Sequence, residues 1–320
     1  MYLVDKINFQ CTDHESTLSR STRSLHCEKG CDFPISHGIP RFVPFDNYSA
    51  AFGEQWKRYR QTQLDSYTKA PLSENRIRQS LGEELWNGLE GKQVLEAGCG
   101  AGRFTEILLK QGAIVTSVDM SDAVVANQEN FPQDDKHRIA QADIFKLPFA
   151  PQQYDIVICL GVIQHTPNSE AAIAELYKHV KPGGWLVIDH YRYLVGYYLR
   201  TAPIFRMFMR KMPYNKTIKF TERMVNSLLP LHKAVRRFRP AQTLLSRVSP
   251  LVVYYQAHPQ FNDELQQEWS LLDTHDSLTD FYKRFRTKGQ IAATLRSLKL
   301  KDIWCEYGGN GVEARGRRPD

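Results

Sequence analysis

Short apolar runs alternate with segments of helical periodicity through the middle of the chain. The runs predict strands at 94–97, 114–118, 137–142, 154–160 and 185–190, and the periodic segments predict helices at 103–111, 121–131 and 168–180. Ser121 and Asn168 are expected to cap the second and third of these helices, and residues 181–184 to form a turn. Strands and helices that alternate in this way form parallel sheets with helices on both faces. We therefore predict an α/β fold, a Rossmann-like doubly wound sheet, over residues 91–190.

The flanking segments carry other patterns, which predict how the chain is divided. Residues 286–320 restore the core pattern with a helix (290–298) and two strands (301–307 and 312–317). The remaining predicted units are a small N-terminal unit rich in turn residues (1–45), a helical cap (46–90) and a mainly helical insertion (191–285). Trp56 and Tyr59 of the cap are expected either to pack in the core or to cover a ligand.

Three closely spaced glycines stand where strand 94–97 turns into the first helix: Gly98, Gly100 and Gly102. Glycine adopts backbone conformations closed to other residues and lets a ligand approach the main chain. Such a loop marks the ligand crevice of a doubly wound sheet. Its Gly-x-Gly-x-Gly spacing differs from the usual dinucleotide-binding pattern. Glu96, just before the loop, would repel a pyrophosphate but suits the ammonium group of a methionine moiety. The loop therefore favours S-adenosylmethionine (SAM) over NAD.

Two further acids follow the next two strands. Asp119 ends the second strand, where a carboxylate can accept both hydroxyls of a ribose. Asp143 follows the third strand and suits an adenine amino group, with the backbone N–H of Ile144 near the ring.

In this order and spacing, the glycine loop, the two acids and the segment 159–165 resemble class I SAM-dependent methyltransferases, within them the group that includes the quinone-biosynthesis methyltransferases. The resemblance covers residues 92–190 closely and 286–320 in outline, where it implies a reversed C-terminal strand hairpin. It implies an enzyme that transfers a methyl group from SAM to a small-molecule or lipid-linked acceptor. The residues that it implies for cofactor binding are Glu96, Gly98, Cys99, Gly100, Gly102, Asp119, Met120, Asp143, Ile144 and Leu160.

Methyl transfer from a sulfonium is an in-line displacement, so the protein mainly has to align the reactants. An oxygen acceptor needs a base as well. His165 follows the fourth strand on the ligand side, and His190 and Tyr191 end the fifth strand. We predict these three residues as candidates for catalysis; the alternative for His165 is a role in building the loop under the cofactor.

The N-terminal unit carries metal-ligating residue types. Cys11 and His14 are followed after twelve residues by Cys27 and Cys31, a spacing plausible for a structural Zn²⁺ site. The run 31–40 resembles the end of a small zinc-ribbon-like domain found ahead of some methyltransferase domains. Those ribbons usually carry two Cys-x-x-Cys knuckles, which this chain lacks. The alternative is a ribbon held together by its apolar residues alone.

Positive charge is concentrated in the predicted insertion. Residues 191–250 hold thirteen Lys or Arg and one acid, a net charge of +12, whereas the whole chain of 320 residues carries +7. Aromatic and apolar residues are interleaved with these charges. The segment therefore suits a helical cap with a solvated basic face, a surface for an anionic membrane or a lipid-linked acceptor, or, less well, nucleic acid. The alternative functions are accordingly an RNA methyltransferase and a non-catalytic SAM-fold module that binds a membrane or a partner.

The apolar stretches and the cysteines indicate in which cellular compartment the protein is expected. No apolar stretch approaches the roughly 18 residues of a transmembrane helix, and the N-terminus does not resemble a signal peptide. Two of the six cysteines lie inside the motifs above and have no obvious disulfide partner. We expect a cytoplasmic protein, peripheral at the membrane if the insertion binds lipid.

Overall fold

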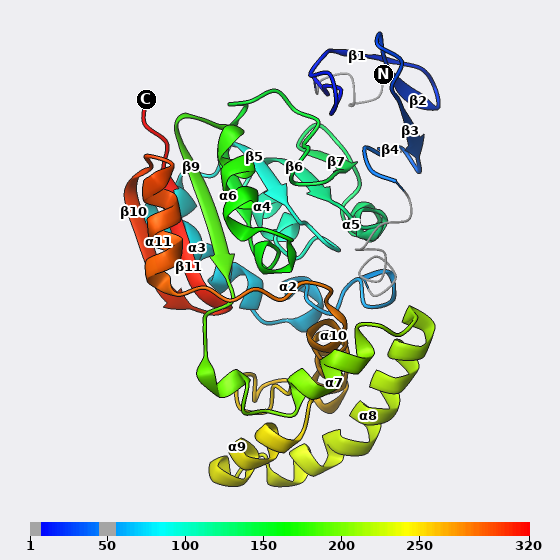
Figure 1. The fold of residues 1–320 in the computed structure, drawn as a ribbon, viewed down its shortest axis with the longest axis vertical. Helices are drawn as coiled ribbons and strands as arrows, with labels where there is room; N and C mark the ends of the chain where they lie inside the picture. Colours follow the sequence, from blue (N-terminus) through cyan, green and yellow to red (C-terminus); the bar gives the residue numbers. More distant parts are fainter. Residues whose placement is uncertain (1–7, 45–55) are drawn as a thin grey trace. The chain divides into compact units, whose positions relative to one another are not determined.

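The computed structural model describes residues 8–44 and 56–320, and the chain divides into two compact units (Figure 1). The core unit comprises Met1–Arg60, Ala70–Arg192 and Arg284–Asp320. The helical unit comprises Gln61–Lys69 and Tyr193–Lys283.

A seven-stranded sheet forms the centre of the core unit, in the order β10-β11-β9-β8-β5-β6-β7. The five strands from β9 to β7 are parallel, and β11 runs antiparallel to both of its neighbours. The strands are β5 (Gln93–Ala97), β6 (Ile114–Asp119), β7 (His137–Gln141), β8 (Tyr154–Cys159), β9 (Val180–His190), β10 (Lys301–Gly308) and β11 (Gly311–Arg317). The predicted Rossmann-like sheet with a reversed C-terminal hairpin is thereby confirmed.

Helices cover both faces of this sheet. They are α3 (Leu72–Asn87), α4 (Thr105–Lys110), α5 (Ala123–Asn130), α6 (Ser169–Lys178) and α11 (Lys288–Ser297). Successive strand residues point to opposite faces, and the two apolar clusters follow this rule. Val94 packs with residues of α3 and α4, whereas the next residue, Leu95, packs with residues of α6 and α11.

The N-terminal segment forms a four-stranded antiparallel sheet of β1 (Leu18–Arg20), β2 (Ser24–Cys27), β3 (Asp32–Ser36) and β4 (Ile39–Pro40). It belongs to the core unit, although the sequence predicts a separate unit. Strands this short bury little apolar surface of their own, and aromatic rings join them to the core: the centroid of Phe9 lies 5.6 Å from that of Phe149 and 5.2 Å from that of Phe42.

The helical unit consists of α2 (Asp65–Thr68), a short 3₁₀ helix (Val195–Tyr197), α7 (Ala202–Met209), α8 (Tyr214–Val235), α9 (Arg239–Val248) and α10 (Asp263–Thr279). Its apolar cluster includes Met209, Val225 and Leu278.

The predicted insertion, 191–285, exceeds the segment 193–283 by two residues at each end. The predicted cap, 46–90, is divided: Thr62 donates a hydrogen bond to Glu268 in α10 at 3.0 Å, whereas α3 packs on the core sheet. Among the described residues, no helix is both long and apolar enough to span a bilayer.

Two local predictions are wrong. The N-cap of helix α5 is Asp122 rather than Ser121, although the hydroxyl of Ser121 accepts the N–H of Ala123 at 3.3 Å while it donates to Asp119 at 2.7 Å. Strand β9 begins at Val180, because the predicted turn at 181–184 stays in the strand and the register with β8 shifts there instead. The predicted cap at Asn168 is confirmed, since its side chain accepts the N–H of Ala171 at 3.0 Å.

Candidate cofactor site and active site

The glycine loop connects β5 to α4 at the carboxyl edge of the sheet. The N–H groups of Gly98 and Cys99 both donate to the carbonyl of Val118, at 2.7 and 3.0 Å, which ties the loop to β6. Gly98 has φ +81°, and a Cβ added there would lie 2.1 Å from a methyl carbon of Val162. Glycine is therefore required at this position both by the backbone conformation and by the close approach of the loop after β8.

Glu96 is a buried carboxylate directly before this loop. Its Oε2 accepts hydrogen bonds from the hydroxyls of Thr105 (2.5 Å) and Ser117 (3.2 Å), and the side chain is 3 % exposed. Its Oε1 has no hydrogen-bond partner among the described residues. Burial raises the pKa of Glu96 to about 7. A buried carboxylate with an unsatisfied oxygen suits a cationic group, as the ammonium of SAM requires.

Asp119 ends β6 beside the loop and helps to shape it. Its Oδ2 accepts the N–H of Gly100 at 3.0 Å, and its Oδ1 accepts the N–H and the hydroxyl of Ser121 at 2.8 and 2.7 Å. Burial raises the pKa of Asp119. Because a carboxylate oxygen has two lone pairs, Oδ2 can accept a further bond from a ribose hydroxyl.

The other predicted cofactor residues lie at the same carboxyl edge of the sheet. The carbonyl of Met120 accepts the amide of Gln141 at 2.9 Å, and Asp143 accepts the N–H of Phe145 at 2.9 Å. Ile144 and Leu160 are buried. Burial raises the pKa of the Cys99 thiol, so Cys99 packs as an apolar residue rather than acting as a nucleophile.

Trp56 lies against the glycine loop. Its indole approaches to 3.4 Å from the position that a Cβ on Gly100 would occupy. Tyr59 is buried. The structure thus brings Trp56 next to the predicted cofactor loop. Phe52, another aromatic residue of the predicted cap, lies outside the described residues.

The three predicted catalytic residues differ in their surroundings. His165 lies in a 3₁₀ turn, Ile163–His165, after β8, with its ring edge-on to Tyr191 at 5.4 Å. Tyr191 also stacks on Phe285, with centroids 6.2 Å apart. His190 is fully buried, its Nδ1 lies 3.0 Å from the carbonyl of Tyr191, and its Nε2 lies 2.9 Å from the hydroxyl of Ser169. Both ring nitrogens of His190 thus have partners, which tie the end of β9 to the start of α6. The catalytic roles of His165, His190 and Tyr191 stay predictions.

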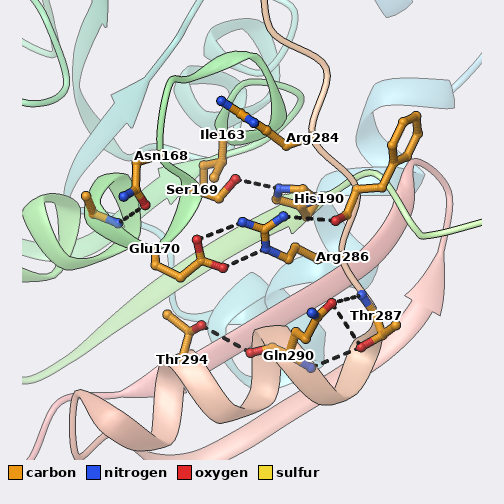
Figure 2. A network of polar contacts seen from close by, with 12 residues as sticks. Ile163, Asn168, Ser169, Glu170, His190, Arg284, Arg286, Thr287, Gln290 and Thr294 are labelled. Atoms are coloured by element: carbon orange, nitrogen blue, oxygen red, sulfur yellow. Dashed lines mark hydrogen bonds and ion pairs between the residues drawn. The ribbon is translucent and has the colours of Figure 1, made fainter.

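A polar network fixes this corner of the core unit (Figure 2). Arg286 forms two hydrogen bonds with Glu170 of α6, at 2.6 and 2.8 Å, and its N–H donates to the carbonyl of Tyr191 at 2.9 Å. The Arg286 guanidinium lowers the pKa of Glu170. Since the chain leaves the core unit after Arg192 and returns at Arg284, this network sets the backbone around Tyr191.

Sequence reasoning missed a second charged group at the carboxyl ends of β8 and β9. Asp189 is buried, pairs with Arg76 of α3, and accepts the N–H of Gly161 at 2.6 Å. Glu313 lies directly opposite Asp189 in β11 and is also buried, and burial raises its pKa. The pairing of these two acids is visible only in the fold, so no local signal in the sequence identified Arg76.

The predicted metal residues converge in space although they are spread over 21 positions of the sequence. The ligand atoms of Cys11, His14, Cys27 and Cys31 all lie within 4.8 Å of one another.

Comparison with known proteins places this site in a family context. Residues 95–188 match the family model described as a methyltransferase domain. A ubiquinone biosynthesis O-methyltransferase of Pseudomonas savastanoi pv. phaseolicola is 37 % identical over 100 residues, which are 30 % of this chain and 43 % of that protein. One of Coxiella burnetii is 38 % identical over 100 residues, 31 % of this chain and 43 % of that protein. The chain thus matches less than half the length of these relatives. The predicted resemblance to class I SAM-dependent methyltransferases is confirmed over this segment.

Solved structures with similar folds include human N-acetylserotonin methyltransferase in complex with SAM, with 14 % identity and a TM-score of 0.48 over 87 % of this chain and 61 % of that chain. The magnesium protoporphyrin IX methyltransferase of Synechocystis, with bound SAH, has 15 % identity and a TM-score of 0.45 over 85 % of this chain and 96 % of that chain.

Proposed function

We propose that the protein transfers a methyl group from SAM to a small-molecule acceptor. The observation that carries this proposal is the set of groups at one sheet edge: a glycine loop tied to β6, a buried carboxylate with an unsatisfied oxygen, and Asp119 at the adjoining strand end. Neither alternative, an RNA methyltransferase or a non-catalytic binding module, is favoured by the sequence matches.

The residues at this edge suit the parts of SAM in turn. Glu96 suits the ammonium group, Asp119 the ribose hydroxyls, and Asp143 with the N–H of Ile144 the adenine. Met120 and Leu160 are the apolar residues that would pack against the cofactor, and Arg76, whose Nε has no hydrogen-bond partner among the described residues, suits a carboxylate. When bound, SAM supplies a methyl group on a positively charged sulfur.

The chain's own part in the reaction is alignment and, for an oxygen acceptor, removal of a proton. His165 is the base candidate in our proposal, because it follows β8 at the carboxyl edge of the sheet and imidazole is the side chain that most often acts as a general base. Tyr191, held between His165 and Phe285, forms an aromatic wall beside it.

Methyl transfer from radiolabelled SAM into fractionated cell extract tests this function.

Replacing Asp119 by Ala removes hydrogen bonds to a charged group and is expected to weaken SAM binding about 10- to 100-fold. Asp135→Ala, which alters an exposed acid in the loop before β7, is the matched control and should bind SAM normally. Equal affinities for wild type and Asp119→Ala would contradict the assigned site.

We further propose that the acceptor is lipid-linked and is met at an anionic membrane surface. Large apolar side chains are exposed between residues 193 and 212 of the helical unit; Leu199 is 77 % and Phe208 61 % exposed. A pocket nearby in the sequence and structure is lined by polar residues that include Arg200 and Arg247. Exposed apolar groups beside arginines suit the boundary between acyl chains and anionic headgroups.

Flotation with vesicles separates this surface from a solvated cap. The protein should float with phosphatidylglycerol vesicles and much less with phosphatidylcholine vesicles. A double variant, Leu199→Ser with Phe208→Ser, should lose flotation, whereas Leu231→Ser, at a 53 % exposed leucine of α8, should keep it. Equal flotation with both lipids would discard the anionic-surface proposal and leave methyl transfer untouched.

A further inference from the structure

The N-terminal sheet gathers three thiols around one imidazole. The Nδ1 atom of His14 lies 3.5 Å from each sulfur of Cys11, Cys27 and Cys31. In a tetrahedral zinc site, bonds of about 2.3 Å to sulfur and about 2.0–2.1 Å to nitrogen place sulfur and nitrogen about 3.5 Å apart. The imidazole nitrogen therefore already lies at the distance from each of the three sulfurs that a shared metal ion requires.

Disulfide bonding does not account for this cluster. All three cysteines are free thiols in the structure, and an odd number of thiols cannot be paired within the group. The backbone between two of these cysteines forms a tight hairpin: the N–H of Cys27 donates to the carbonyl of Cys31 at 2.8 Å, which holds both residues at one site.

Polar donors support negative charge on the cluster. The hydroxyl of Ser16 lies 3.1 Å from the sulfur of Cys27, and the N–H of Lys29 donates to the same sulfur at 3.4 Å. Donors of this kind surround metal-bound thiolates and orient them.

The same sheet reaches the cofactor edge through Arg41, which follows β4. Arg41 is buried, donates to the side chain of Gln141 at 2.9 Å and pairs with Asp122 at 2.7 Å. Gln141 in turn donates to the carbonyl of Met120. Arg41 thus connects the N-terminal sheet to the turn that carries Asp119 and Met120.

We propose that Cys11, His14, Cys27 and Cys31 bind one Zn²⁺ ion, and that this ion fixes the sheet from which Arg41 positions the ribose-binding turn. A sheet of four short strands cannot supply much stability of its own, and a structural metal is a common means of fixing such a unit. The second half of the proposal rests on the function proposed above; the metal site does not.

Metal content of the 320-residue chain tests the first half. Protein purified without chelators should contain one zinc per chain, and Co²⁺ added after chelation should give the visible absorption of a tetrahedral thiolate site. Cys27→Ser should bind less than a fifth as much metal, whereas Cys305→Ser, at a buried cysteine in β10, should keep full occupancy. Wild-type protein that holds no zinc and gives no tetrahedral Co²⁺ spectrum would overturn the site, whatever the folding of the variants.

Calorimetry with SAM tests the second half. Chelation of the wild-type protein, and Arg41→Ala in the zinc-loaded protein, should each raise the Kd for SAM about tenfold. An unchanged Kd after complete loss of zinc would overturn the coupling and leave the metal site standing. Zinc-loaded wild-type protein that does not bind SAM at all would instead overturn the proposed function.

Discussion

The two units bury carboxylates in opposite surroundings. In the helical unit, Asp280 lies between Arg206, at 2.6 Å, and Lys283, at 3.0 Å, and all three side chains are largely buried. In the core unit, Glu96 is equally buried, but its hydrogen bonds come from neutral donors, two hydroxyls and the backbone N–H of Thr105, and no cation pairs with it among the described residues. A buried carboxylate costs free energy unless it is paired. The paired Asp280 therefore stabilises the helical unit. The ionised Glu96 lowers the stability of the core unit, and a cationic ligand would offset that loss.

Replacing Asp280 by Ala should give the largest effect on stability. It leaves the buried charges of Arg206 and Lys283 without their carboxylate, and breaking a buried pair in this way costs about 3–5 kcal/mol. Urea unfolding followed by tryptophan fluorescence should show the transition of the helical unit at a much lower midpoint.

Asp263→Ala is the matched control for this variant. Asp263 pairs with Lys233 at 2.5 Å, but both side chains are exposed to solvent, where ion pairs contribute little. Its unfolding midpoint should equal that of wild type. If Asp280→Ala and Asp263→Ala unfold alike, burial of the Asp280 network does not stabilise the helical unit.

Replacing a glycine in each unit by alanine compares the two units a second time. Ala at Gly98 combines a left-handed backbone with a Cβ 2.1 Å from Val162, and should lower the free energy of unfolding by about 2–4 kcal/mol and abolish SAM binding. Ala at Gly196, in the helical unit, meets no atom within 4 Å and should leave both properties unchanged. The measurements are urea unfolding and calorimetry with SAM. Normal SAM binding by Gly98→Ala would show that the loop does not hold the cofactor.

The sequence predicts the core unit well because its signals are local. Buried parallel strands appear as continuous apolar runs, and the glycine loop is a contiguous motif at a strand end. The four candidate metal-ligating residues were likewise recognisable by spacing alone, although only the structure brings their side chains together.

Long-range pairs escaped prediction because nothing near them in the sequence identifies the partner. Arg76 and Asp189 are 113 positions apart, and Arg41 and Asp122 are 81 positions apart. The same holds for residues 61–69, whose partners lie about 200 positions later in α10. His190 was predicted to be catalytic from its place at a strand end, but its partners Ser169 and Tyr191 became visible only in the fold.

The smallest predicted change in stability is the most informative about function, and it concerns Glu96→Gln. The pKa of Glu96, about 7 in the folded protein, lies above its ordinary value of 4.5. Proton uptake therefore favours the folded state at low pH, and that contribution is lost as the pH rises through 7. Glu96→Gln, which cannot ionise, should be more stable than wild type at pH 8 by roughly 1–3 kcal/mol and show no gain at pH 3, below the ordinary pKa of 4.5.

The affinity of the wild type for SAM should fall as the pH is lowered, whereas the stability of its fold rises. The reason is that only the ionised carboxylate attracts an ammonium group. For a pKa near 7, the wild-type Kd should rise about tenfold between pH 8 and pH 6. Glu96→Gln should bind SAM weakly with little dependence on pH, whereas Glu129→Gln, at an exposed acid of α5, should behave as wild type. Calorimetry at the two pH values measures all three. A wild-type Kd that is constant across this range would mean that the buried carboxylate does not meet the cation, and that its cost in stability serves something other than the cofactor.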